Sequence, residues 1–184
     1  MLYMIIAAAA FALDQLLKLW ASSNMNLHEI RSLIPGVLQL RLEQNTGAAL
    51  SILSNHTWIL SILSVSAAVL MVFFLLRRGL SRWEKTAVAL VLGGTVGNAI
   101  DRVLLGYVVD MLEMEFLPIF VFNLADVFID VGAVVFVLLY IIRSFREEKT
   151  MHGDMPELER LRRSEEKSRS LSEPEEGEDA CSDS

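Results

Sequence analysis

Residues 93–102 read Gly-Gly-Thr-Val-Gly-Asn-Ala-Ile-Asp-Arg, which predicts an apolar helix that ends in polar residues. Its glycines at positions 93 and 97 stand one helical turn apart, a spacing that lets a neighbouring helix approach closely inside a membrane. Asn98, Asp101 and Arg102 share one face of the same helix. Because such groups are costly in lipid, this face is expected to look into a helix bundle or a hydrated cavity. Asp101 and Arg102 alone fit equally well an ion pair that marks the helix end.

The composition indicates a membrane domain followed by a charged tail. The chain has 184 residues, of which 53% are hydrophobic, with a mean hydropathy of +0.45. The net charge is −7, and residues 150–184 supply −6 of it. We predict a membrane domain over 1–149 and an acidic, disordered cytoplasmic tail over 150–184, within which only 157–167 forms a transient helix. No nucleic-acid partner is expected.

The cysteine and histidine residues form no recognisable disulfide, catalytic or metal-binding pattern. The single cysteine, Cys181, lies in the predicted tail, so that a disulfide framework is impossible and a thiol nucleophile would have no fixed position. His28, His56 and His152 stand apart from one another and from that cysteine. Their spacing gives no zinc site.

Apolar runs predict four membrane spans, at about 2–20, 57–76, 86–102 and 119–142. The first run differs from a secretory signal peptide because it begins without basic residues and carries Asp14 and Lys18 near its far end, so we interpret it as a retained span. These two residues fit a simple i, i+4 ion pair, or a pair with a function at that depth.

Residues 21–56 form a polar outer segment between the first two spans. Leu38, Leu40 and Leu42 alternate with polar residues, which predicts a half-buried strand and a small sheet on the membrane surface. Asn45 ends this strand, either as an ordinary turn residue or as a polar group aimed at a ligand.

Basic residues fix the predicted orientation. They follow the second span and the fourth span, and basic clusters of this kind mark cytoplasmic loops; they are Arg77, Arg78, Arg82 and Lys85, then Arg143, Arg146 and Lys149. The predicted fold class is therefore an all-α polytopic membrane protein with four transmembrane helices, a small extracytoplasmic β-sheet and both termini in the cytoplasm.

This topology brings scattered polar residues to one level, near the outer membrane surface. The residues are Asp14, Lys18, Asn45, Asn98, Asp101, Arg102, Asp110, Asn123 and Asp126. The chemistry that suits such a set is two carboxylates sharing one proton, one activating water while the other protonates a carbonyl. The residues alone do not choose the pair, which remains open among Asp14, Asp101, Asp110, Asp126 and Asp130.

Five motifs in order resemble the lipoprotein signal peptidase family, also called signal peptidase II. They are Asp14-Gln15-Leu16-Leu17-Lys18, Asn45-Thr46-Gly47-Ala48-Ala49, Gly93-Gly94 with Gly97 to Arg102, Val108-Val109-Asp110 and Phe122-Asn123-Leu124-Ala125-Asp126. The resemblance spans roughly residues 2–146. It implies a bacterial inner-membrane aspartic protease that cuts signal peptides from prolipoproteins, immediately before a cysteine that carries diacylglycerol.

The same resemblance assigns roles to residues. The catalytic dyad maps onto Asp110 and Asp126, and the site-supporting positions map onto Asp14, Lys18, Asn45, Asn98, Arg102 and Asn123. Asp101 would be structural, fixing the segment that carries Asp110. The implied partners are the diacylglyceryl-prolipoprotein substrate and membrane lipid, with no metal or other cofactor, and we expect a monomer.

Three positions depart from the family pattern. Leu50 and Met111 stand where phenylalanine is expected, which changes packing or lipid contacts rather than chemistry. Asp130 is an additional acid one turn beyond Asp126, and it would either perturb the dyad or face other helices.

Three other functions compete with the protease. In a small transporter or channel, Asp14, Asp101 and Asp126 would form an ion path, but the inner halves of the later spans are nearly apolar. A transferase would use the carboxylates to hold Mg²⁺, and chelator sensitivity distinguishes it. A structural scaffold leaves the clustering at one membrane surface unexplained.

Overall fold

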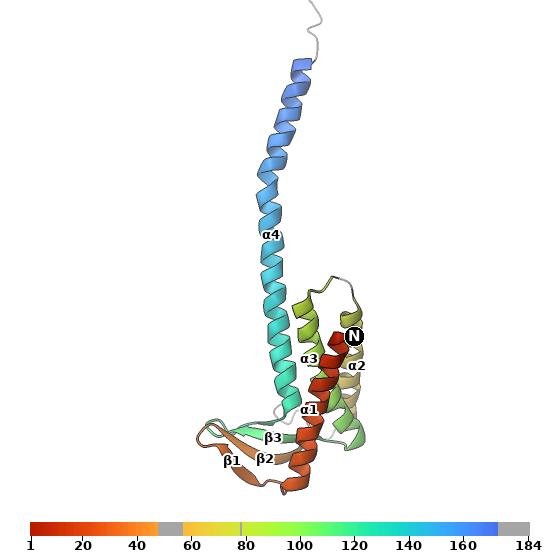
Figure 1. Ribbon diagram of the computed structural model, residues 1–184, viewed down its shortest axis with the longest axis vertical. Helices are drawn as coiled ribbons and strands as arrows, with labels where there is room; N and C mark the ends of the chain where they lie inside the picture. The colour runs from red at the N-terminus through yellow and green to blue at the C-terminus, as the bar shows by residue number, and fades with distance from the viewer. Residues whose placement is uncertain (48–56, 78, 173–184) are drawn as a thin grey trace, which may run out of the picture. The chain divides into compact units, whose positions relative to one another are not determined.

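The computed structural model describes residues 1–47, 57–77 and 79–172, and the chain divides into two compact units, Met1–Tyr140 and Ile141–Ser184. Its four helices are α1 (Leu2–Asn24), α2 (Thr57–Leu76), α3 (Arg82–Leu104) and α4 (Leu124–Ser172). Each contains a stretch long and apolar enough to cross a membrane, which in α4 is Leu124–Arg146. The four predicted spans are confirmed as apolar helices (Figure 1).

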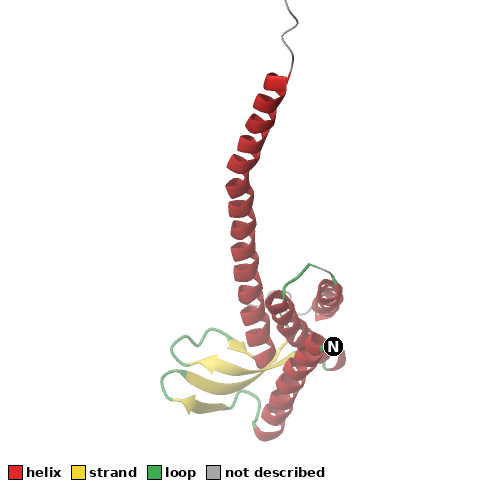
Figure 2. Ribbon diagram, turned by 45° about the horizontal axis from the view of Figure 1, so that its top comes forward, coloured by secondary structure: helices red, strands yellow, loops and turns green. Residues whose placement is uncertain are grey.

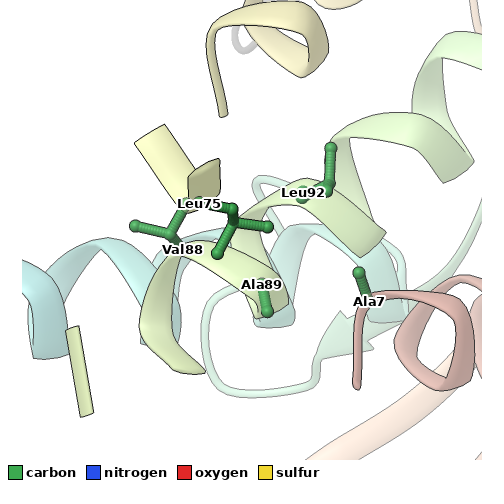
Figure 3. Close-up of a cluster of buried hydrophobic side chains, with 5 residues drawn as sticks. All are labelled: Ala7, Leu75, Val88, Ala89 and Leu92. Carbon is green, nitrogen blue, oxygen red and sulfur yellow. The ribbon is translucent and has the colours of Figure 1, made fainter. Parts of the chain in front are cut away.

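Helix α3 is the centre of the first unit. Its candidate span is 61% buried, against 22% for α1 and 11% for α2, because α3 packs on the other helices while their outer faces remain free. Ala7 of α1, Leu75 of α2 and Val88, Ala89 and Leu92 of α3 form a buried apolar cluster (Figure 3).

Glycines on α3 set the distances between the helices. A Cβ built on Gly93 would lie 2.5 Å from the carbonyl oxygen of Ala7 in α1. A Cβ on Gly94 would clash with the carbonyl oxygen of Ala125 in α4. Close approach of helix backbones is therefore the physical reason for small residues here, as the sequence predicted for Gly93.

Two helices begin at other residues than expected, one because of a cap and the other because of strand pairing. Helix α3 begins at Arg82 instead of about 86, because Ser81 and Glu84 form a capping box in which the Ser81 Oγ accepts from the Glu84 N–H at 3.2 Å. Helix α4 begins at Leu124 instead of about 119, because residues 121–122 pair as a strand.

The sheet is larger than the sequence indicated. Its antiparallel strands, in spatial order, are β1 (Ile30–Ile34), β2 (Leu38–Asn45), β3 (Val108–Met114) and β4 (Val121–Phe122). The predicted strand through Leu38 and Leu40 is confirmed as β2. In Figure 1 the strands run crosswise to α1 and α3, and the sheet lies at one end of these helices. A cluster around Ala21, Met25 and Met111 joins the end of α1 to the sheet.

The second unit differs from the predicted disorder. Helix α4 is assigned as far as Ser172, so residues 150–172 are helical in the structure where a disordered tail was expected from Thr150. Glutamate, leucine, arginine and lysine are strong helix formers and dominate residues 157–169, which explains the helix there. Residues 173–184, with Cys181, and residues 48–56, with Leu50, lie outside the described residues.

Candidate active site

The eight predicted site residues form one connected network. They come from α1, β2, α3, β3 and the segment that begins α4, and they meet where the helices reach the sheet. The members are Asp14, Lys18, Asn45, Asn98, Arg102, Asp110, Asn123 and Asp126. Asp130 is exposed, and no hydrogen bond links it to this network within the described residues.

Lys18 forms the charged end of the network. Its Nζ lies 2.8 Å from Asp14 Oδ2 and 2.8 Å from Asp101 Oδ2, and it donates to Asn98 Oδ1 at 2.9 Å. Its side chain is 4% exposed. Three acceptors satisfy the three protons of the ammonium group, which a buried cation requires. The predicted i, i+4 pair with Asp14 is present. The contacts of Lys18 with Asp101 and Asn98 also join α1 to α3.

Asp14 joins three helices. Its Oδ1 accepts a hydrogen bond from the backbone N–H of Ala125 at 2.9 Å, at the beginning of α4. A carboxylate is stabilised there by the unpaired N–H groups and the positive end of the helix dipole. A Cβ on Gly97 would lie 2.6 Å from Asp14 Oδ2, so that only glycine at this position of α3 leaves room for the carboxylate.

Asn123 and Asp126 cap α4 reciprocally. The Asp126 N–H donates to Asn123 Oδ1 at 3.0 Å, and the Asn123 N–H donates to Asp126 Oδ2 at 3.2 Å. This is the capping-box arrangement with Asn and Asp in its two positions. The second oxygen of Asp126, Oδ1, accepts from Asn98 Nδ2 at 2.8 Å. The backbone and α3 thus fix the orientation of the Asp126 carboxylate.

Asp110 lies in β3 and is 2% exposed. Its Oδ1 accepts from Asn123 Nδ2 at 2.6 Å and its Oδ2 accepts from Asn45 Nδ2 at 2.9 Å. Burial raises the pKa of Asp110 from 3.8 to about 7. The Asn45 and Asn123 hydrogen bonds oppose this rise, and the charge of Asp126 adds to it. A carboxyl group in this state exchanges protons near neutral pH.

Two amide side chains connect Asp110 with Asp126. Asn123 Nδ2 donates both to Asp110 Oδ1 and, at 3.2 Å, to Asn98 Oδ1. Asn98 in turn donates to Asp126 and accepts from Lys18. The two carboxylates are therefore hydrogen-bonded by neutral donors, and the Lys18 ammonium is separated from Asp126 by one amide side chain and from Asp110 by two.

Asp101 supports the strand that carries Asp110. Its Oδ2 accepts from the Val109 N–H at 3.4 Å, next to Asp110 in the chain, and its Oδ1 accepts from Gln15 Nε2 at 3.0 Å. Lys18 is the ion-pair partner of Asp101, so the Asp101 carboxylate links α1, α3 and β3. This arrangement differs from the alternative of an isolated Asp101–Arg102 pair at the helix end.

Arg102 lies at the edge of the site. Its Nη1 contacts Ser64 Oγ at 3.4 Å and the carbonyl oxygen of Asn98 at 3.3 Å. Its Nε is buried and has no hydrogen-bond partner within residues 1–47, 57–77 and 79–172. The guanidinium therefore retains donor capacity beside the two carboxylates.

Sequence reasoning overlooked two contributors. Gln15 donates to Asp14 and Asp101, and its position directly after Asp14 in the first motif was the available signal. Ser64 contacts Arg102 from an otherwise apolar helix, and nothing in its local sequence indicated this. No three histidine, cysteine, aspartate or glutamate side chains gather as metal ligands in the part of the chain that the structure describes.

Fold and site together define a multi-pass membrane protein with a buried polar site where its helices meet a small antiparallel sheet. Residues 6–142 match the model of the signal peptidase (SPase) II family. The chain belongs to this family of peptidases, as the sequence resemblance predicted.

Similar proteins of known family support this assignment. The lipoprotein signal peptidase of Streptococcus thermophilus strain CNRZ 1066 is 40% identical over 145 residues, which cover 78% of this chain and 92% of the relative. That of Streptococcus pyogenes serotype M2 is 38% identical over 138 residues, covering 74% and 88%. A bacterial membrane enzyme solved by the in meso method superposes with a TM-score of 0.73 at 27% identity, covering 77% of this chain and 88% of that one.

Proposed function

We propose that this protein is an intramembrane aspartic endopeptidase that removes signal peptides from diacylglyceryl-modified prolipoproteins. It cuts before the lipid-modified cysteine, with Asp110 and Asp126 as the catalytic dyad. Family membership and the names of the relatives support the substrate class. The aspartic mechanism and the choice of dyad are supported by the geometry of the site.

The observation that carries the proposal is how the five candidate carboxylates are partnered. Asp14 and Asp101 are each ion-paired with Lys18, a buried cation. Asp130 is exposed and lies outside the network. Asp110 and Asp126 remain, and among the described residues the hydrogen bonds to their carboxylates come from amide and backbone donors only. They are the pair free to share a proton.

Shared protonation provides the chemistry of peptide hydrolysis. The ionised carboxylate takes a proton from water while the protonated carboxyl donates its proton to the carbonyl oxygen, and the water oxygen bonds to the carbonyl carbon. Collapse of the tetrahedral intermediate breaks the C–N bond, the proton on the first carboxyl passes to the leaving amine, and a hydroxyl proton of the intermediate returns to the second carboxylate. The raised pKa of Asp110, about 7, keeps a proton available at neutral pH. Asn98 and Asn123 hold the two carboxylates in fixed positions during proton transfer.

The proposed setting is the bacterial inner membrane, with both termini in the cytoplasm and the site near the extracytoplasmic surface. The basic residues at the end of α2 and of the α4 span support this orientation, since they lie at the opposite ends of their helices from the site. A substrate anchored by its lipid and its signal helix would then reach the dyad by diffusion within the bilayer. We propose that the enzyme acts as a monomer, without a metal.

The test is cleavage of a diacylglyceryl-modified prolipoprotein by the purified, lipid-reconstituted protein in the presence of a chelator. Asp110→Asn and Asp126→Asn are compared with Asp130→Asn, a matched control that makes the same change at an exposed carboxylate of α4. We expect wild type and Asp130→Asn to cleave before the modified cysteine, and each dyad variant to lose at least about 10²–10⁴-fold in rate.

Three results would contradict the proposal. Substantial activity of Asp110→Asn or Asp126→Asn, with Asp130→Asn inactive, would mean that the dyad is a different pair. Loss of wild-type cleavage on chelation, restored by Mg²⁺, would favour metal-assisted chemistry. A well-folded wild type that never cleaves, but conducts protons or cations in vesicles, would favour a transporter.

A further inference from the structure

Two loops meet at the end of the sheet that lies away from α1. They are the β1–β2 turn and the β3–β4 connection, and both are visible in Figure 2 as loops at the ends of the strands. The Gly36 N–H donates to Glu115 Oε2 at 2.7 Å, and the Glu115 N–H donates to the carbonyl oxygen of Val37 at 3.0 Å. These bonds join the loops into one surface.

This surface is apolar and exposed. We define the apolar tip as Leu33, Ile34, Val37, Phe116, Leu117, Ile119 and Phe120, all of which are exposed large hydrophobic residues. Phe116 is 66% exposed and Ile119 is 62% exposed. The only ionisable side chain in residues 33–37 and 114–120 is Glu115, and its carboxylate accepts the hydrogen bond from Gly36. Soluble surfaces rarely gather apolar residues in this way without a binding partner.

We propose that the apolar tip inserts into the lipid interface of the bilayer, as a membrane contact separate from the four spans. Continuity along the chain supports lipid as the occupant. Phe120 stands four residues before Leu124, where the α4 span begins, so the backbone between them reaches at most about 14 Å. The chain therefore keeps the tip close to the depth at which α4 enters the membrane.

The direction of the sheet supports the same occupant. Its strands run crosswise to α1 and α3, so the sheet extends along a membrane that these helices cross (Figure 1). Phenylalanine and branched aliphatic side chains without a neighbouring charge suit the boundary between headgroups and acyl chains. A consequence is that β3, which carries Asp110, would be held at a fixed depth by the end of α1 on one side and by the tip on the other. The inference rests on the spans and does not depend on the proposed peptidase reaction.

The experiment measures the surroundings of single nitroxide labels in the full-length protein. In a Cys181→Ser background, Phe116→Cys and Ile119→Cys are labelled separately and reconstituted into vesicles of phosphatidylethanolamine and phosphatidylglycerol. Accessibility to oxygen, which is enriched in lipid, is compared with accessibility to a water-soluble nickel chelate. Leu63→Cys, on the exposed face of α2, is the lipid control, and Ser164→Cys, on α4 beyond its span, is the aqueous control.

We expect the labels at positions 116 and 119 to prefer oxygen over the nickel chelate, as the label at position 63 does. Nickel accessibility equal to that at position 164 would overturn the proposal. Low accessibility to both reagents would overturn it as well, because it would mean that protein covers the tip, and a dilution series in lipid would then show whether that protein is a second copy. Both labelled residues are exposed, so their replacement leaves the buried packing intact.

Discussion

Asp14 in α1 accepts a hydrogen bond from the backbone N–H of Ala125 in α4, at 2.9 Å. The two residues are 111 positions apart in the chain. This bond fixes the first turn of α4, in which Asp126 follows Ala125 directly, so a residue that contacts neither carboxylate of the proposed dyad controls the orientation of one of them.

Asp14→Ala should therefore destabilise the protein and lower activity together. The change removes the cap of α4 and leaves Lys18 buried with one carboxylate partner less, and breaking a buried ion pair costs about 3–5 kcal/mol. Thermal unfolding in detergent measures the loss. Asp130→Asn is the control, since exposed substitutions usually change the unfolding free energy by no more than about 0.5 kcal/mol. Equal melting temperatures for the two variants would show that Asp14 does not support α4.

Gly97→Ala should also destabilise, because its Cβ would lie 2.6 Å from Asp14 Oδ2. Overpacking of this kind costs about 1–3 kcal/mol, against a gain of about 1 kcal/mol in helix propensity. Combining Gly97→Ala with Asp14→Ala tests the cause, since removal of the carboxylate should relieve the clash and make the two effects less than additive. Full additivity of the two losses would place the origin of the Gly97 effect elsewhere.

The activity of wild type should fall as the pH rises through about 7. Asp110 has a raised pKa of about 7, so its carboxyl is protonated below that value and loses its proton above it. A dyad that needs one shared proton becomes inactive when both carboxylates are ionised. The measurement is kcat/KM against pH with a lipid-modified peptide. A rate that stays constant from pH 6 to pH 9 would contradict a role for a proton on Asp110.

Asn45→Ala should move this alkaline limb to higher pH. The Asn45 amide donates to Asp110 Oδ2 at 2.9 Å and lowers the pKa of Asp110 by stabilising its ionised form. A hydrogen bond to a charged group is worth about 1.5–3 kcal/mol, which corresponds to a shift of about one pH unit or more. Arg41→Ala, in the same strand but outside the site, is the control and should leave the limb in place. A shift toward lower pH in Asn45→Ala would contradict the assigned direction.

The sequence by itself determined the elements that depend on local pattern. Twenty-residue apolar runs have few alternatives to membrane helices, and the alternation of Leu38 and Leu40 allows only a half-buried strand. The motifs also predicted the family, and with it the candidate residues of the site. The start of α4 was within reach as well, because Asn123 and Asp126 have the spacing of a capping box, but the apolar run from Ile119 concealed it.

Contacts between distant segments settle which carboxylates form an ion pair with Lys18. The residues alone left the choice among Asp14, Asp101, Asp110 and Asp126 open, and in the structure Lys18 pairs with the first two of them. The same holds for β3, whose strand conformation depends on pairing with β2 some 65 residues earlier. Hydrogen bonds and ion pairs between distant segments produce no periodic pattern in the sequence of either segment. Such contacts, which assign each carboxylate its environment, form only when the helices and the sheet pack together.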